Sequence, residues 1–355
     1  MNNHSTPPIS RRHLLGIVGL GMVATSCGAP QTVGPSLLDL PSTPTVSPTS
    51  ARRTAATTTT SPTTAAVTPA VDEQAQHIGV SRIQAARGRG LPRKVVGGYW
   101  PLSQPDAIRL RDLPAGFNLV YLFAGVPRGA PGEVVLDPAG NGRGAQQNLV
   151  ADIAAARSTQ GRSIVLSVGG AGGGIVFDSR ATSSRFVTSV RGIVDGLGGI
   201  DGVDLNTFEA DATPNLTEYS WISSQLKSAY GQSFAITAPP APWKLTDRAF
   251  CKAMVTAGLL DLCGPQYYDG AGLATPDYIT GDIGQWVDLV GADKLCIGFG
   301  VNNPGDYMTT DQCVSTWNTV RSAHPDIRGA FVWNVATDES NRWGFVNRVG
   351  SLVAG

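Results

Sequence analysis

The segment GIDGVDLNTFEA, residues 199–210, holds the side chains best suited to acid–base chemistry in this chain. It places Asp204, Asn206 and Glu209 close together. A carboxylic acid can donate or accept a proton at a bond being hydrolysed, and an amide can orient a polar group of a substrate. In a regular strand, however, Asp204, Asn206 and Phe208 share one face and Glu209 falls on the other. The spacing alone therefore leaves the direction of Glu209 open.

Other aromatic and acidic side chains follow further short apolar runs of the sequence. Aromatic faces stack on sugar rings, and carboxylates supply acid–base catalysis at a glycosidic bond. Core packing explains any single one of them, but their recurrence at one point of successive repeats favours a shared site. The candidates are Tyr99, Trp100, Asp211, Trp243, Tyr267, Tyr268, Asp269, Trp333 and Asp338.

Eight short apolar strands alternate with amphipathic helical stretches after residue 93. The strands are expected at 94–100, 118–126, 163–170, 200–208, 233–240, 260–268, 294–301 and 329–335. The helices named between and after them are 146–160, 183–197, 218–230, 247–258, 312–324 and 343–353. This pattern predicts an α/β fold with one closed (β/α)8 TIM barrel over residues 94–355, whose site lies at the C-terminal ends of the strands. A doubly wound open sheet is the rival architecture, but no Gly-rich phosphate loop follows the first strand.

The first 93 residues read as export and spacer segments. Residues 1–27 pair Arg11-Arg12 with a short apolar run, which predicts an export signal with twin-arginine features. The signal ends in a lipobox-like sequence, so Cys27 is expected to carry a lipid that tethers the protein to a membrane without spanning it. Residues 28–72 are rich in Pro, Thr and Ser and predict a disordered linker, and 73–93 a transition segment.

The overall composition gives no reason to expect a nucleic acid, an anionic membrane surface, a metal or a cofactor as partner. The chain has 27 basic and 27 acidic residues, so its formal net charge is zero. This balance gives no electrostatic reason to expect a nucleic acid or an anionic membrane surface as partner. With only four His and no zinc-type cysteine spacing, we expect neither a metal nor a cofactor.

Four cysteines remain once Cys27 is set aside, an even number for an exported protein. Disulfides are therefore expected, and the smallest loops are closed by pairing Cys251 with Cys263 and Cys296 with Cys313.

Six motifs in barrel order resemble glycoside hydrolase family 18, the chitinase-like barrels. These are VVGGYW, VYLFAG, the SVGG of residues 167–170, IDGVDLN, the QYYD of residues 266–269, and RGAFVWNV with Trp333. The resemblance covers the whole of residues 94–355. The interval between the seventh and eighth strands is too short for the extra insert of many members, which implies an open groove like that of the compact hevamine-type enzymes.

The resemblance implies roles for the residues of the first segment. Active members protonate the leaving oxygen with the Glu of a DxDxE motif, and the substrate's own acetamido oxygen attacks the anomeric carbon. On this pattern Glu209 is the proton donor although it stands one residue late, with Phe208 at the expected position. Asn206 and Tyr268 would orient the acetamido group, and Asp204 would support them.

Three hypotheses account for the displaced glutamate. In the first, a β-bulge between Asn206 and Glu209 turns the acid into the barrel. In the second, Glu209 works with a second carboxylate, Asp211, Asp269 or Asp338, on another envelope glycan. In the third, Phe208 occupies the place of the acid and the barrel only binds sugar.

The most consistent hypothesis is an exported glycoside hydrolase acting on a β-linked polysaccharide that contains N-acetylglucosamine. The alternatives are an inactive carbohydrate-binding lipoprotein and a two-carboxylate glycosidase. The residues expected to bind the glycan are Tyr99, Trp243, Gln266, Asp269 and Trp333.

Overall fold

The computed structural model describes residues 88–104, 107–136, 148–207, 213–302 and 307–355, all of them within one compact unit, Thr68–Gly355. The predicted export signal, the linker and Cys27 lie outside the described residues, as do Phe208, Glu209 and Asp211. Nearly all of the predicted barrel is therefore open to comparison.

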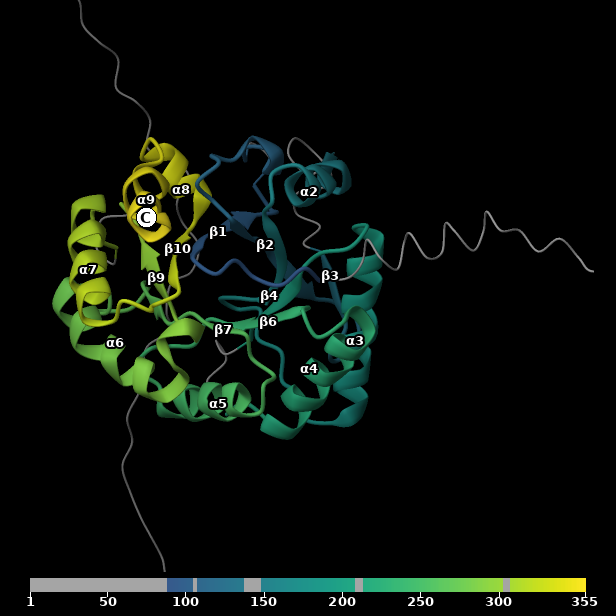
Figure 1. Ribbon diagram of the computed structural model, residues 1–355. Helices are drawn as coiled ribbons and strands as arrows, with labels where there is room; N and C mark the ends of the chain where they lie inside the picture. The colour runs from purple at the N-terminus through teal and green to yellow at the C-terminus, as the bar shows by residue number, and fades with distance from the viewer. Residues whose placement is uncertain (1–87, 105–106, 137–147, 208–212, 303–306) are drawn as a thin grey trace, which may run out of the picture. The chain divides into compact units, whose positions relative to one another are not determined.

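Parallel strands form the centre of the fold and confirm the predicted (β/α)8 barrel (Figure 1). They follow one another around the sheet in the order β7-β6-β5-β4-β2-β1-β10-β9-β8. β7 and β8 are two short pieces of one barrel strand, so the two ends of this order meet and close the sheet. The strands are β1 Val95–Pro101, β2 Leu119–Pro127, β4 Ser163–Gly169, β5 Gly202–Asn206, β6 Ala235–Ala238, β7 Leu262–Cys263, β8 Gln266–Tyr267, β9 Cys296–Gly300 and β10 Gly329–Trp333.

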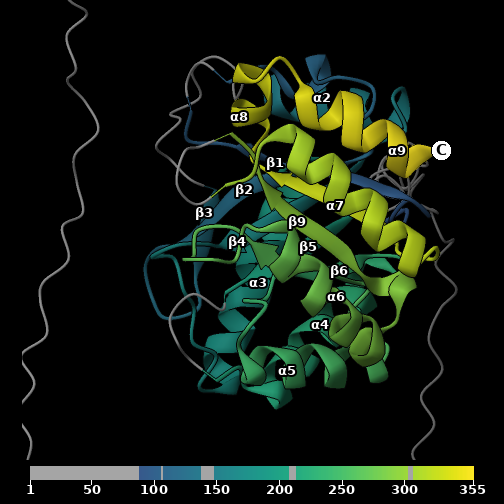
Figure 2. The ribbon, with the colours of Figure 1, turned by 90° about the vertical axis from the view of Figure 1, so that its left-hand side faces the viewer.

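Helices cover the outside of the strands, as Figures 1 and 2 show. They are α2 Leu149–Ser158, α3 Arg180–Gly196, α4 Leu216–Tyr230, α5 Leu245–Thr256, α6 Pro276–Val290, α7 Thr310–Ala323, α8 Val335–Ser340 and, after the π-helical turn Phe345–Gly350, α9 Ser351–Ala354. The sequence interpretation did not name α6, nor the short strand β3, Val134–Leu136, which pairs antiparallel with β2. None of the described helices is long and apolar enough to cross a membrane.

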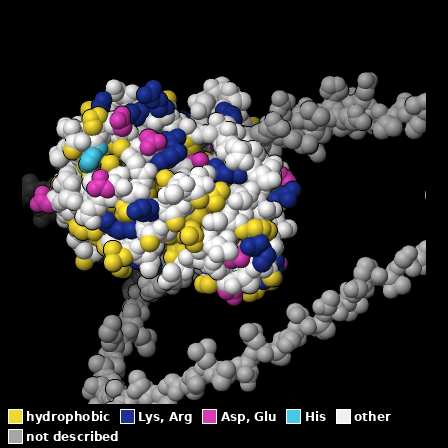
Figure 3. Space-filling view, turned by 60° about the horizontal axis from the view of Figure 1, so that its bottom comes forward, with side chains coloured by type: hydrophobic (Ala, Val, Ile, Leu, Met, Phe, Trp, Pro, Cys, Tyr) yellow, Lys and Arg dark blue, Asp and Glu magenta, His cyan; other side chains and the backbone are white. Residues whose placement is uncertain are grey.

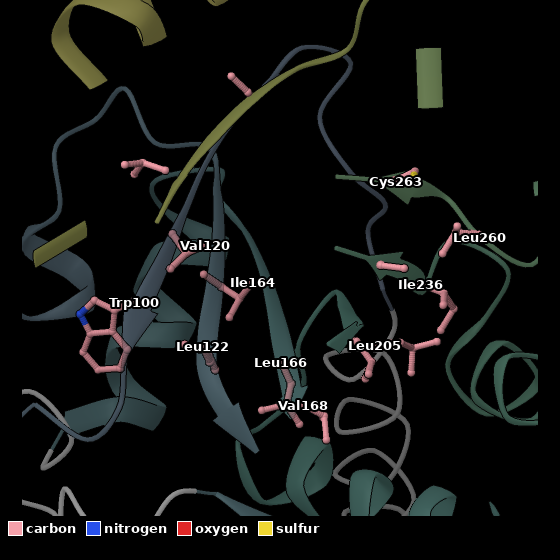
Figure 4. Packing of buried hydrophobic residues seen from close by; sticks show 14 of the residues in the cluster. Trp100, Val120, Leu122, Ile164, Leu166, Val168, Leu205, Ile236, Leu260 and Cys263 are labelled. Carbon is pink, nitrogen blue, oxygen red and sulfur yellow. The ribbon is translucent and has the colours of Figure 1, made fainter. Parts of the chain in front are cut away.

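Alternate residues of each strand belong to two separate hydrophobic layers. Val120, Ile164 and Leu205 lie in the outer layer (Figure 4). The same layer contains apolar residues of the helices. Tyr99, Tyr121, Val165 and Phe331 form the inner layer, which fills the barrel. Because side chains alternate along a strand, Asp204 and Asn206 face the barrel interior on either side of Leu205.

The segment 88–92, just before β1, closes the N-terminal end of the barrel. Arg89 donates hydrogen bonds from its backbone N and its Nε to Oδ1 of Asp201, each 3.2 Å long. Arg157 binds the same carboxylate at 3.0 Å, and Arg328 donates to the carbonyl of Pro92 at 3.0 Å. Asp201 is fully buried immediately before β5. Asp201 therefore holds the N-terminal end of the barrel together. It takes no part in a site at the C-terminal ends of the strands.

The two predicted disulfides are absent, because all four cysteines are buried free thiols. Cys296 lies in the inner layer and Cys313 in the outer layer, so this pair is separated by the barrel wall. Cys251 and Cys263 share the outer layer, where burial raises the pKa of the Cys263 thiol well above its ordinary value. Burial raises the pKa of Cys296 and of Cys313 to about 12, which keeps these two thiols protonated and unreactive.

Replacing Asp201 with Ala should lower the free energy of unfolding by about 3–5 kcal/mol, because two guanidinium groups lose their buried partner. Chemical denaturation of the full chain measures this loss, and Asp277→Ala, an exposed acid on α6, is the control. An effect of Asp201→Ala no larger than that of the control would contradict the structural role.

Candidate active site

Asp204 is the centre of the polar groups inside the barrel. Its side chain is 1% exposed and accepts three hydrogen bonds from hydroxyl groups. Tyr99 and Ser167 donate to Oδ2 at 2.9 and 2.8 Å, and Thr237 donates to Oδ1 at 2.6 Å. These donors come from β1, β4 and β6, so the carboxylate links strands on both sides of β5.

Burial sets the protonation of this carboxylate. Loss of hydration raises the pKa of Asp204 from 3.8 to about 6, although the three hydroxyl donors act to lower it. The same burial, and the neighbouring Asp204 charge, raise the pKa of Tyr99 well above its ordinary value. At neutral pH the Asp204 carboxylate is therefore a negative charge next to the neutral phenol of Tyr99.

Asn206 lies one inward position above Asp204 and presents an unused acceptor. Its side chain is 3% exposed, and its Oδ1 has no hydrogen-bond partner among the described residues. A buried acceptor without a partner costs free energy, and a ligand that brings an N–H group removes that cost. Asn206 is thus suited to bind a polar group that enters the barrel mouth.

The strand β5 is regular up to this point. Asn206 pairs with Gly169 of β4 without a shift in register. The next side chain, Thr207, bonds to the hydroxyl of Tyr219 in the outer layer. Inward and outward positions thus still alternate at Thr207, so any bulge that turns Glu209 inward must begin after Asn206.

Aromatic rings form one wall next to the Asp204 hydroxyl network. Trp333 is half-buried and lies parallel to Tyr268, with ring centroids 6.0 Å apart and an interplanar angle of 9°. Trp333 also packs edge-to-face with Phe123 and with Tyr99, with ring centroids 4.8 Å and 5.4 Å apart. Tyr99 therefore connects the carboxylate to the aromatic wall, and the predicted residues Asp204, Tyr99, Tyr268 and Trp333 form one contiguous group.

Three other predicted glycan-binding residues lie outside this group. Gln266 donates from Nε2 to the carbonyl of Pro239 at 2.5 Å, so it holds the loop after β6. Asp269 is exposed in the turn after β8, with a φ of 55°. Trp243 is 59% exposed in the loop between β6 and α5.

Asp338 cannot be the second catalytic carboxylate, which corrects one of the predicted pairings. It is fully buried and accepts hydrogen bonds from the backbone N of Phe345 at 2.7 Å and of Val346 at 3.1 Å. Burial raises its pKa to about 6, against the effect of these two donors. Asp338 caps the last helical segment and is closed off from a substrate.

Sequence reasoning missed the donors Ser167 and Thr237 and the aromatic neighbours Tyr121, Phe123 and Tyr307. Tyr121 stacks on Tyr99 at 4.5 Å. A weak signal existed, since Ser167 and Thr237 are polar residues within apolar strands. Their common partner became visible only through the strand register, which places Ser167 beside Asp204 and Asp204 beside Thr237.

Within the described part of the chain, no cluster of three or more His, Cys, Asp or Glu side chains could hold a metal ion. On the face shown in Figure 3, acidic and basic side chains are interspersed without a field of one sign.

Comparison with known proteins connects the chain to chitinases. No protein-family model matches the chain. A curated relative, exochitinase 1 of Streptomyces olivaceoviridis, is 27% identical over 170 residues, and the match covers 42% of this chain and 28% of the relative. The matched part thus spans little more than a quarter of the length of that relative.

Solved structures share the fold over most of the barrel. A protein of Streptomyces coelicolor described as a chitinase A is 22% identical, with a TM-score of 0.65 over 74% of this chain and 99% of that one. A family GH18 chitinase from Chromobacterium violaceum is 20% identical, with a TM-score of 0.64 over 76% of this chain and 86% of that one. The chain therefore has the chitinase-like fold of glycoside hydrolase family 18, as its motifs predicted.

The raised pKa of Asp204 makes its contribution to stability pH-dependent. The folded state holds the proton more tightly than the unfolded state, so this contribution falls as the pH rises from about 4 to about 6 and is constant above. Relative to Asp204→Asn, the wild type should be more stable at pH 4 than at pH 7 by up to about 3 kcal/mol.

Denaturation of both proteins across this pH range measures the difference, and the exposed Asp277→Asn controls for loss of one charge. A stability difference that does not change between pH 4 and pH 7 would contradict the raised pKa.

Proposed function

We propose that the protein is an exported, lipid-anchored glycoside hydrolase that cleaves a β-linked polysaccharide containing N-acetylglucosamine. The proposal depends on the buried Asp204 carboxylate with its three hydroxyl donors, and on Oδ1 of Asn206 above it, which has no hydrogen-bond partner among the described residues. A site of this kind suits a substrate that brings its own amide into the barrel mouth. The shared fold with family 18 chitinases supports the same class of substrate.

In the proposed reaction the acetamido group of the substrate is the nucleophile. Asn206 Oδ1 accepts the acetamido N–H, and the Tyr268 hydroxyl contacts the acetamido oxygen, which attacks the anomeric carbon. Glu209 gives its proton to the leaving oxygen as the glycosidic bond breaks. Water then opens the cyclic intermediate and returns a proton to Glu209.

The neutral amide of Asn206 cannot balance the positive charge of the intermediate. Asp204 supplies a negative charge one inward position below, and it is ionised above a pH of about 6. The charge acts through a low-dielectric interior, where its effect is stronger than in water.

A carbohydrate-binding protein without hydrolysis is the second candidate. The regular course of β5 through Asn206, with Thr207 directed to the outer layer, favours it. If the same alternation continued for one more residue, Phe208 would face inward in place of an acid.

The replacement Glu209→Gln should lower the rate of glycan hydrolysis by at least about 10²-fold, because the proton donor is lost. Product release by the purified full chain from chitin oligosaccharides and from cell-envelope glycans measures this rate. Glu339→Gln, an exposed acid on α8, is the matched control.

The wild type distinguishes the alternatives in the same assay. Cleavage only of a glycan without acetamido groups would support a two-carboxylate reaction. Binding of oligosaccharides without any cleavage by the wild type would replace the hydrolase with a carbohydrate-binding protein.

Replacing Cys27 with Ser should move the protein from the membrane fraction to the soluble exported fraction, because the lipidated residue is removed. Fractionation of a bacterial host that expresses the full chain measures the distribution, with Cys313→Ser as the control. Retention of Cys27→Ser in the membrane fraction would contradict the lipid anchor.

A further inference from the structure

The site residue Tyr268 directly follows a strand that has little backbone support. β8 consists of Gln266–Tyr267 alone, and within the described part of the chain it forms ladder pairs only with β9. It is separated from β7 by Gly264 and Pro265, and a proline has no N–H to donate to a ladder. Side-chain contacts are therefore needed to hold Tyr268 parallel to Trp333.

The side chain of Tyr267 points away from the barrel interior and is fixed by an acid of α6. It is fully buried in the outer layer, and its hydroxyl donates to Oδ2 of Asp282 at 2.9 Å. Loss of hydration raises the pKa of Tyr267 well above its ordinary value, so the phenol keeps its proton and remains a donor. Tyr268 lies in the inner layer. Because adjacent side chains of an extended chain face opposite sides, holding Tyr267 also fixes the direction of Tyr268.

Arg248 of α5 holds the other oxygen of Asp282. Its Nη2 donates to Oδ1 of Asp282, and its Nη1 donates to Oε1 of Gln285 at 3.1 Å. The guanidinium also lies 5.0 Å from the ring centre of Trp286. The side chains of Arg248 and Asp282 are only 11% and 9% exposed, so little water reaches this ion pair. The carboxylate is bonded at both oxygens and presents Oδ2 to Tyr267 in one orientation.

The same network extends to the loop that follows β6. β6 ends at Ala238, before the level of β8. Beyond it, Gln266 donates from Nε2 to the carbonyl of Pro239 at 2.5 Å, and Arg248 donates from Nε to the carbonyl of Pro242 at 2.9 Å. Side chains of β8 and α5 therefore bind the loop on the side of β8 where the sheet has no ladder.

We propose that Tyr267, Asp282 and Arg248 are positioning residues for the cleavage reaction, and that they set the placement of the Tyr268 hydroxyl through the backbone of β8. The proposal rests on the role of Tyr268 in the proposed function. Tyr267 lies in the outer layer, on the helix side of the barrel wall, so the network acts through Tyr268 without touching the substrate. Misplacement of a reacting group by about 1 Å lowers a rate by up to about 10²-fold.

The test is a double-mutant cycle in the full chain, with a chitin oligosaccharide as substrate. Tyr267→Phe removes one hydroxyl and leaves the ring, and it should lower kcat by about tenfold while KM changes by less than about twofold. Tyr268→Phe alone should lower kcat further. In the Tyr268→Phe background, Tyr267→Phe should have no additional effect, because its effect passes through the Tyr268 hydroxyl.

Tyr230→Phe is the matched control. The hydroxyl of Tyr230 on α4 also donates to an aspartate, Asp195, at 3.0 Å, and Tyr230 is likewise buried. This variant should keep the kcat of the wild type. A general loss of folded protein in Tyr267→Phe would lower the rate equally in both backgrounds, so the cycle separates a positioning role from a merely structural one.

Each outcome decides for or against the positioning role. An equal effect of Tyr267→Phe in both backgrounds would overturn it, and so would an unchanged kcat in Tyr267→Phe alone, while the hydrolase proposal would stand. If the wild type binds the oligosaccharide without cleaving it, the hydrolase proposal fails. The same cycle measured on Kd then upholds the positioning role if it is non-additive and overturns it if it is additive. A wild type that neither binds nor cleaves the oligosaccharide would overturn both proposals.

Discussion

The burial of the Asp204 carboxylate is the constraint on which the interior of this barrel depends. A charge removed from water is costly unless hydrogen bonds replace its hydration. Here hydroxyl groups of Tyr99, Ser167 and Thr237 supply those bonds from three strands on both sides of β5. The Asp204 carboxylate therefore requires hydroxyl side chains at the inward positions that face it on the neighbouring strands. It forms a polar centre among the aromatic rings of the barrel interior.

Two buried carboxylates, three residues apart in the chain, serve different purposes in this barrel. Asp201, immediately before β5, forms ion pairs with Arg89 and Arg157 and holds the N-terminal end of the barrel together. Asp204, three residues later, accepts hydrogen bonds from neutral hydroxyl groups among the described residues, and burial raises its pKa. The two aspartates differ in their partners, which are guanidinium groups at Asp201 and hydroxyl groups at Asp204. A structural role suits the first environment, and a role in chemistry suits the second.

The strand pattern and the family motifs could be read from the sequence because they are local. Each of the eight predicted strands is present, since a short run of Val, Ile, Leu and aromatic residues favours a buried parallel strand. The inward direction of Asp204 and Asn206 followed from alternation along β5. The pairing of Cys296 with Cys313 was wrong because an even number of cysteines and a short spacing say nothing about which layer a cysteine enters. Asp338 was wrong as a catalytic partner because its capping contacts come from residues that follow a turn.

By itself, the sequence determined the fold class, the order of the strands and the identity of the central acid segment, since these depend on local periodicity and motif order. Only the tertiary structure decided which hydroxyls surround Asp204, that Trp333 lies parallel to Tyr268, and that Gln266 holds the loop of Trp243. These contacts join residues far apart in the chain. Their geometry depends on the closure and register of the whole barrel, which no short stretch of sequence encodes.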